Sequence, residues 1–153
     1  MPLAKSAEKF ILKQLDAHNV LTLATQRPDG YPQATIVAFA HDGLDLYVAV
    51  DAASQKAKNI RRNGKVSVAV GRDHRDWGRI RALSMAAHAQ VLKKSAEIGH
   101  AQAVLAARFP QIKAMGETDG YQGWAFLRIA PLVVSMLDYT RGFGHTELAD
   151  LRT

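Results

Sequence analysis

A strand that passes directly into a helix is the feature that most limits how this chain can fold. Residues 44 to 50 alternate in polarity, which is the two-residue period of a half-buried strand. The expected inner face holds Leu44, Leu46, Val48 and Val50, and the outer face holds Asp45, Tyr47 and Ala49. After Asp51 the period changes to that of a helix, with Ala53, Ala57 and Ile60 on one side.

The start of this helix carries groups that suit an anion. The first helical turn has free backbone N–H groups and the positive end of the helix dipole, and both attract a phosphate. Ser54 adds a hydroxyl, and Lys56 adds a full positive charge. The segment therefore predicts a phosphate site. Two other interpretations stay open: Ser54 as an ordinary helix cap, and the lysines and arginines that follow as a solvated face.

The basic residues between positions 56 and 65 also raise the question of a polyanionic partner. The chain has 20 Lys and Arg against 14 Asp and Glu, a formal net charge of +6, which favours contact with anions. No recognised nucleic-acid motif accompanies the cluster, and aromatic side chains do not alternate with it. We therefore expect no nucleic-acid partner.

Length and composition restrict the class of protein. The 153 residues fit one domain, 1–153, with enough apolar content (48%) for a core of its own. The absence of cysteine excludes disulfides, thiol catalysis, Cys-ligated zinc and iron–sulfur clusters. No apolar run approaches the roughly 20 residues that span a bilayer, and the N-terminus lacks the apolar region of a secretion signal. We expect a cytoplasmic protein with no membrane partner.

The rest of the sequence predicts three helices and six or seven strands. An opening helix ends near His18, the second helix is the one after Asp51, and the third covers 95–108, where Pro110 helps to end it. Strands are expected at 20–25, 33–40, 44–50, 66–70, 80–92, 124–129 and 132–137, with Pro131 at a bulge or edge between the last two. Short turns at 27–32 and 41–43 make the first three strands an antiparallel meander. These elements indicate an α+β protein whose strands close into a small barrel.

Four segments carry a resemblance to a known family. They are the opening helix before VLTLAT, the hairpin RPDGYPQATIVAF, the strand LDLYVAV with the following ASQKAKNI, and the terminal LDYTRGFGHTEL. In these segments and in the order of its elements, the chain resembles the FMN-binding split-barrel family related to pyridoxamine 5′-phosphate oxidase, over nearly its whole length. The resemblance implies a six- to seven-stranded, mostly antiparallel split β-barrel with flanking helices.

The same resemblance implies a cofactor site. The segment SQKAKNI matches the family's phosphate-binding segment, which assigns the FMN phosphate to Ser54, Gln55, Lys56 and Asn59. The family's second and third strands lie beside the flavin ring and ribityl chain. Strand alignment therefore adds Thr35, Ile36 and Val37 from one strand and Ala49 and Val50 from the other. A shift of one residue in that alignment exchanges their faces.

The resemblance further implies a homodimer with two FMN molecules at the subunit interface, each contacted by both chains. A flavin-dependent oxidoreductase acting on a small molecule is the leading hypothesis. Pyridoxamine-phosphate oxidation itself is not expected, because residues 34 to 38 are small or apolar where the oxidase has an Arg and a Lys. The C-terminal segment likewise lacks the oxidase's paired Arg and Trp.

Two alternatives keep the fold and change the cofactor or the role. Deazaflavin F420 has a longer phosphorylated tail, for which Lys58, Arg61 and Arg62 could form a basic groove. A non-catalytic flavin or haem carrier is the other, because relatives of this barrel include haem-binding members.

No metal site is expected, since the histidines show no close ligand spacing. They are His18, His41, His74, His88, His100 and His145.

Overall fold

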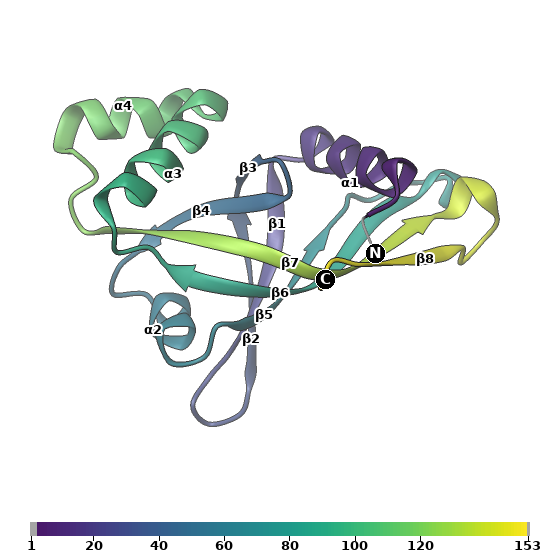
Figure 1. The fold of residues 1–153 in the computed structure, drawn as a ribbon, viewed down its shortest axis with the longest axis horizontal. Coiled ribbons are helices and arrows are strands. Elements are labelled where there is room, and N and C mark those ends of the chain that lie inside the picture. The colour runs from purple at the N-terminus through teal and green to yellow at the C-terminus, as the bar shows by residue number, and fades with distance from the viewer. Residues whose placement is uncertain (1–2, 153) are drawn as a thin grey trace.

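In the computed structural model, which describes residues 3–152, eight strands form one sheet and four α-helices flank it (Figure 1). The helices are α1 Lys5–Ala17, α2 Gln55–Arg62, α3 Ser95–Arg108 and α4 Pro110–Asp119. The strands are β1 Val20–Gln26, β2 Pro32–Ala38, β3 Ala40–Asp42, β4 Asp45–Asp51, β5 Lys65–Val70, β6 Arg81–Val91, β7 Trp124–Asp138 and β8 Thr146–Asp150. Two 3₁₀ turns are η1 Trp77–Arg79 and η2 Tyr139–Arg141. The α+β class is confirmed.

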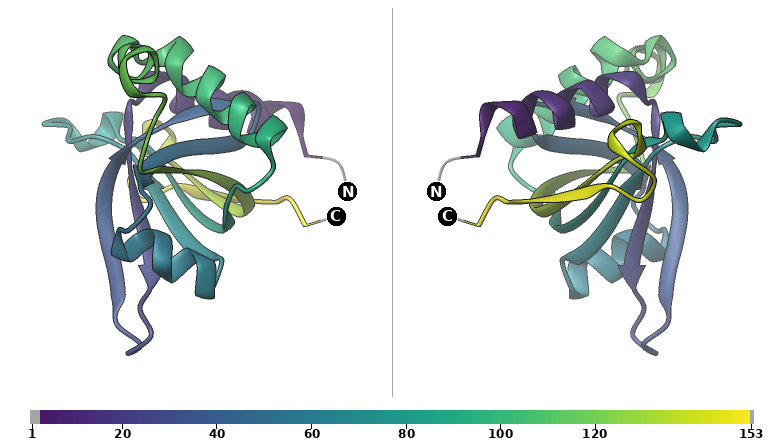
Figure 2. Two further views of the ribbon diagram at one scale, coloured as in Figure 1. Left: turned by 90° about the vertical axis from the view of Figure 1, so that its left-hand side faces the viewer. Right: turned by 90° about the vertical axis from the view of Figure 1, so that its right-hand side faces the viewer.

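The sheet curls into an antiparallel half-barrel, so the split-barrel prediction is also confirmed (Figure 2). Its order is β2-β1-β5-β6-β7-β4-β3, and β8 pairs with β7. The main core fills the inside of the curl with aliphatic side chains from the strands. Helix α1 closes this space because Ile11 and Leu15, both fully buried, enter the same cluster.

The predicted meander of three strands is wrong, because the chain turns a corner at Phe39. Strand β2 pairs with β1, whereas the short β3 beyond the corner pairs with β4, and β4 pairs with β7. The Phe39 side chain is fully buried, and its N–H donates to Asn19 O at 3.1 Å. This buried anchor moves the chain from one edge of the sheet to the other, so β2 and β3 form the two edges of an open barrel.

The expected outer position of Tyr47 is also wrong. Tyr47 is only 5% exposed because α3 covers the outer face of β4 and forms a second apolar cluster with Ala101 and Leu105. The Tyr47 ring meets the His100 ring edge-on at 5.6 Å between centroids. Burial raises the pKa of the Tyr47 hydroxyl, and the charge of Asp45 adds to the shift. Both faces of β4 are therefore covered.

The C-terminal half contains two elements that the sequence did not predict. Pro110 opens α4 at its first turn, where the missing N–H of proline costs nothing, and Gly120 ends that helix in the left-handed region at φ 65°. Strand β7 is continuous through Pro131, and only its pairing with β6 shifts, between Ala86 and Ala87. The expected bulge is confirmed, and the expected break into two strands is wrong. Strand β8 is the second unpredicted element.

No helix within residues 3–152 is long and apolar enough to cross a bilayer.

Arg108, the last residue of α3, fastens that helix to the end of α1. Its guanidinium donates to the carbonyl oxygens of Leu15 at 3.0 Å, Asp16 at 3.2 Å and His18. The last carbonyls of a helix have no partner within the helix, so Arg108 supplies the missing donors. Its Cζ also lies 5.0 Å from the centre of the Phe39 ring. Burial lowers the pKa of this guanidinium, yet arginine remains protonated in proteins.

We expect Arg108→Ala to lower the free energy of unfolding by about 2 kcal/mol, because charge-assisted hydrogen bonds are lost and partly buried carbonyls lose their donors. Urea denaturation measures the change. Arg152→Ala is the matched control, since Arg152 pairs only with the neighbouring Asp150 at the surface, and its effect should stay below about 0.5 kcal/mol. Equal losses in the two variants would contradict the fastening role.

Candidate functional site

A tight turn joins β4 to α2. The Asp51 carboxylate accepts the N–H of Ala53 at 2.8 Å, and the Ser54 N–H donates to Asp51 O at 3.0 Å. An aspartate that binds the backbone two residues ahead stabilises such a turn. The turn directs the chain from the sheet into α2 at Ser54, as the change of sequence period predicted.

Ser54 caps α2. Its Oγ accepts the N–H of Ala57 at 3.3 Å, and its carbonyl accepts the N–H of Lys58 at 3.2 Å. The cap interpretation is therefore correct, but it does not use every donor. Within residues 3–152 the N–H groups of Gln55 and Lys56 have no acceptor, and the Ser54 hydroxyl can still donate its proton. These three donors lie at the positive end of the helix dipole.

The cations of α2 divide into free and occupied groups. Arg61 donates to Ala52 O at 2.9 Å, in the β4–α2 turn. Arg62 donates to Gln26 O at 3.1 Å, at the end of β1, so both guanidinium groups already have acceptors. In the described part of the chain, the Lys56 ammonium forms neither an ion pair nor a hydrogen bond. Lys58 is exposed. Lys56, half-buried at the first turn, is thus the free charge beside the free N–H groups.

Asn59 is 1% exposed and holds α2 against the first hairpin. Its Nδ2 donates to Thr25 Oγ1 at 3.0 Å and to Gln33 Oε1 at 3.4 Å, and its Oδ1 accepts from Gln55 Nε2 at 2.8 Å. In this structure Asn59 and Gln55 position the helix. Direct contact of these two residues with a cofactor phosphate stays a prediction.

The structure distributes the predicted strand residues over two faces. Val37 and Val50 pack into the main core, and Ile36 points outward with 73% of its surface exposed. Thr35 lies on the inner side of β2, where its Oγ1 is buried without a hydrogen-bond partner. A buried hydroxyl without a partner is costly, so a ligand group that pairs with it would relieve the cost. Strands β2 and β4 contact one another although they do not pair.

A cleft of about 400 Å³ adjoins the β4–α2 turn, and Ala49, Val50 and Asp51 line it together with Gly123 and Trp124. The Ala52 N–H donates to Gly123 O at 3.0 Å, which ties the two segments together. The volume lies within the usual range for small-molecule sites. Residues 122–124 carry no local sequence signal for this site, because only the pairing of β4 with β7 places them beside the β4–α2 turn.

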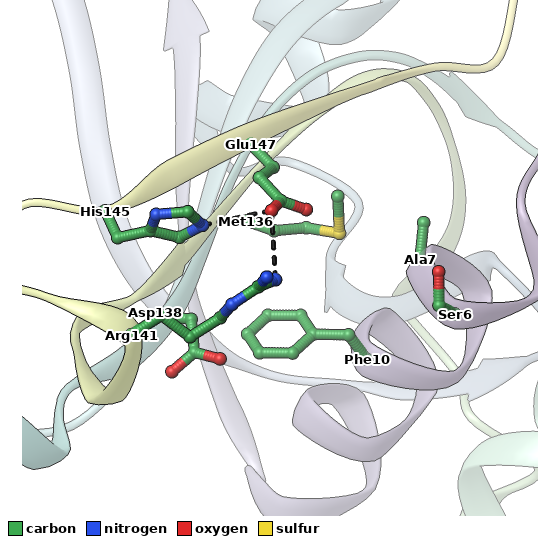
Figure 3. Close-up of a pocket in the computed structure, with 8 residues that line it drawn as sticks. All are labelled: Ser6, Ala7, Phe10, Met136, Asp138, Arg141, His145 and Glu147. Atoms are coloured by element: carbon green, nitrogen blue, oxygen red, sulfur yellow. Dashed lines mark hydrogen bonds and ion pairs between the residues drawn. The ribbon is translucent and has the colours of Figure 1, made fainter.

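His145 lies apart from these groups, in a small pocket at the C-terminal end of the sheet (Figure 3). Its Nε2 and the Arg141 guanidinium each lie 3.0 Å from Glu147 Oε1. Asp138 also lines this pocket. Burial raises the pKa of Asp138, but hydrogen bonds from Thr140 and Arg81 outweigh it and hold that pKa below its usual range. Among residues 3–152, no three His, Asp or Glu side chains gather to hold a metal ion.

Comparison with known proteins identifies the family. Residues 7–134 match the family model described as pyridoxamine 5′-phosphate oxidase. The chain belongs to the pyridoxamine 5′-phosphate oxidase family, as the sequence resemblance predicted. General stress protein 26 of Bacillus subtilis is 35% identical over 68 residues, which is 44% of this chain and 48% of that protein. The match thus spans about half of that relative.

Solved structures show the same fold. A haem-binding protein from Mycobacterium smegmatis superposes with a TM-score of 0.79 at 18% identity, covering 97% of this chain and 60% of that one. HutZ, the haem storage protein of Vibrio cholerae, gives a TM-score of 0.68 at 19% identity, covering 94% and 93%. At these identities the likeness establishes the architecture alone.

We expect Thr35→Val to raise the free energy of unfolding of the cofactor-free protein by about 1 kcal/mol, because it replaces an unpaired buried hydroxyl with a methyl group of similar size. Thr25→Val is the matched control. It removes the acceptor of the Asn59 amide and should destabilise by about 1–3 kcal/mol. Thermal or urea unfolding measures both. Destabilisation by Thr35→Val would mean that its hydroxyl is already paired inside the protein.

Proposed function

We propose that this chain binds FMN and uses it as an oxidoreductase on a small molecule. The observation that carries the proposal is the set of free donors at the start of α2: the N–H groups of Gln55 and Lys56, the Ser54 hydroxyl and the Lys56 ammonium. A phosphate monoester is the anion that such a set fits, because several oxygens accept from backbone donors while a full positive charge balances the dianion.

The unpaired Thr35 Oγ1 supports a ligand with a hydroxylated chain beside the phosphate. FMN has such a chain, and its flavin ring supplies the redox chemistry. In the proposed site, Ser54 and Lys56 hold the phosphate, and Thr35 pairs with a ribityl hydroxyl. The backbone at Ala49 and Val50 lies beside the cleft that adjoins the turn. The protein's part is to fix the position of the ring and to limit its exposure to water.

The alternative cofactor F420 receives less support. Its longer phosphorylated tail needs further free cations along α2, but the Arg61 and Arg62 guanidinium groups already bind Ala52 O and Gln26 O. Only Lys58 remains free in the predicted extension of the groove. The shorter FMN phosphate needs no more than the first turn of the helix.

Haem binding is the second candidate function. It is favoured by the similarity to a haem-binding protein of Mycobacterium smegmatis and to HutZ, a haem storage protein. On this alternative the chain is a carrier without redox turnover. The two candidates differ in what the α2 donors do, since haem has no phosphate for Lys56 to bind.

Lys56→Ala should weaken FMN binding by about ten- to a hundredfold, since it removes one charge-assisted contact of roughly 1.5–3 kcal/mol. Flavin fluorescence titration measures the dissociation constant. The matched control is Lys58→Ala, on the same helix but outside the first turn, and it should change affinity less than threefold. Equal effects of the two variants would identify α2 as a solvated basic face and reject the phosphate site.

We also propose that the chain forms a homodimer with the cofactor near the interface. A row of uncharged side chains crosses the outer face of the sheet from β2 to β8, because residues directly opposite one another share a face. The row is Ile36, Thr22, Ala69, Ser84, Ser135 and Leu148. Its end residues Ile36 and Leu148 are 73% and 71% exposed. An exposed uncharged surface of this kind supports association with a second copy.

Ile36→Lys should convert the dimer into a monomer, because it places a charge in the face that the proposed dimer buries. Sedimentation velocity at micromolar concentration measures the outcome. Met115→Lys, which changes an exposed apolar residue on α4 away from this face, should leave the dimer intact. A monomeric unmodified protein would contradict the dimer proposal.

A further inference from the structure

Two aromatic side chains form an exposed stack at the end of the sheet where β6 begins. Trp77 in η1 and Phe143 after η2 lie with their ring centroids 6.0 Å apart, and they are 63% and 76% exposed. Both views of Figure 2 show the loop that carries η1 extending away from the molecule on the side of β1 and β2. Aromatic side chains bury large apolar surfaces, so an exposed stack of this kind marks an interaction site.

Backbone hydrogen bonds hold this stack in place. The Asp76 carboxylate accepts the N–H of Gly78 at 2.9 Å, which fixes the turn around Trp77. The Tyr139 N–H donates to Ile80 O at 2.9 Å, and this bond joins η2 to the loop of η1. A surface that is fixed before binding loses little conformational entropy when a partner covers it. The stack is therefore preorganised for a contact.

A groove of about 510 Å³ lies on the outer face of the sheet beside this loop. Its lining includes the small side chains of Thr22, Ala69 and Ser84, from β1, β5 and β6, and the exposed Ile36 of β2. These four residues belong to the uncharged row of the proposed dimer surface. The volume is large enough for a bulky organic group, and small lining residues leave room for an aromatic ring that enters from outside.

The groove and the stack belong to neighbouring parts of one surface. Arg72 and Asp73 line the groove and begin the loop that carries Trp77. A two-fold axis between the groove and the stack would place the stack of each copy over the groove of the other, and such a contact closes instead of extending into a filament. The carboxylates of Asp73 and Asp76 beside Trp77 disfavour an anionic membrane as the occupant.

The area that such a contact buries suits a stable dimer. Covering the four rings, two from each copy, removes roughly 400–700 Å² of surface from contact with water, and the groove residues that cover them lose about as much. The total reaches the roughly 1,000 Å² that a specific interface requires. The stack and the groove together therefore account for a large part of a dimer interface.

We propose that the Trp77–Phe143 stack of each copy seats in the groove of a second copy, with the Trp77 ring against the small residues Ala69 and Ser84. The inference rests on the homodimer proposed above and names the contact that holds the two copies together. Trp77 is the central residue of this contact, because a buried indole at the centre of an interface carries a large share of the binding free energy.

The emission of Trp77 tests the contact in the full-length protein. The Trp124→Phe variant keeps Trp77 as its one tryptophan. Its emission spectrum is recorded from nanomolar to micromolar protein concentration, alongside sedimentation velocity of the same samples. Dimer formation should shift the Trp77 emission to shorter wavelength and reduce its quenching by acrylamide, because the indole leaves water.

Substitutions on both sides of the contact locate it. Trp77→Ala should raise the dissociation constant of the dimer about thirtyfold, the effect of a central contact residue. The matched control is Tyr31→Ala, which removes a similarly exposed ring between β1 and β2 and should change the constant less than about threefold. Ala69→Trp fills the groove from its own chain and should weaken the dimer as strongly as Trp77→Ala. Combining Ala69→Trp with Trp77→Ala should add little further loss, since both remove the same contact.

Several results would overturn the inference. A dimer in which Trp77 keeps the emission of an exposed indole overturns it and leaves the dimer proposal standing. Losses that multiply in the double variant, or equal effects of Trp77→Ala and Tyr31→Ala, also overturn it. A shift caused by phosphatidylserine vesicles and not by protein concentration would assign the stack to a membrane instead. A protein that stays monomeric at micromolar concentration contradicts both the inference and the dimer, whereas FMN binding is a separate readout.

Discussion

A buried amide, the side chain of Asn59, is the interaction on which the candidate site depends. It joins α2 to both strands of the first hairpin through Thr25 and Gln33, and it also fixes Gln55. An amide removed from water is tolerated only when its hydrogen bonds are satisfied, and here the donor and the acceptor are both used. Asn59 therefore holds α2 against Thr25 of β1 and Gln33 of β2, and the first turn of this fixed helix carries the free N–H groups and Lys56.

The corner at Phe39 is the second feature on which the candidate site depends. Because the chain leaves β2 there and continues as β3 on the far side of the sheet, β2 keeps an unpaired edge and two different faces. The inner face carries the unpaired Thr35 hydroxyl, and the outer face carries the exposed Ile36. In the proposed site the ligand pairs with the inner face of β2, and the proposed dimer surface includes its outer face, so cofactor binding and dimerisation would share this one strand.

Local sequence patterns predicted α1, α2, α3 and most strands, because each has its own period and end signals. What they missed depends on tertiary contacts. Tyr47 alternates as an outer residue, but α3 covers it. A proline can follow the end of one helix or open the next, and the sequence alone does not separate the two cases. In the structure Pro110 opens α4. The strand β8 is short and largely exposed, so it has no apolar alternation to reveal it. The Ser54 cap and the free N–H groups of the first turn could both be predicted from the sequence, because capping leaves the N–H groups of Gln55 and Lys56 unused.

The most direct test is the visible spectrum of the protein purified without added cofactor, followed by mass spectrometry of any ligand released on denaturation. The account predicts flavin absorbance and released FMN, or uptake of added FMN by a colourless preparation. A Soret band with released haem, or a colourless protein that does not bind FMN, would contradict it.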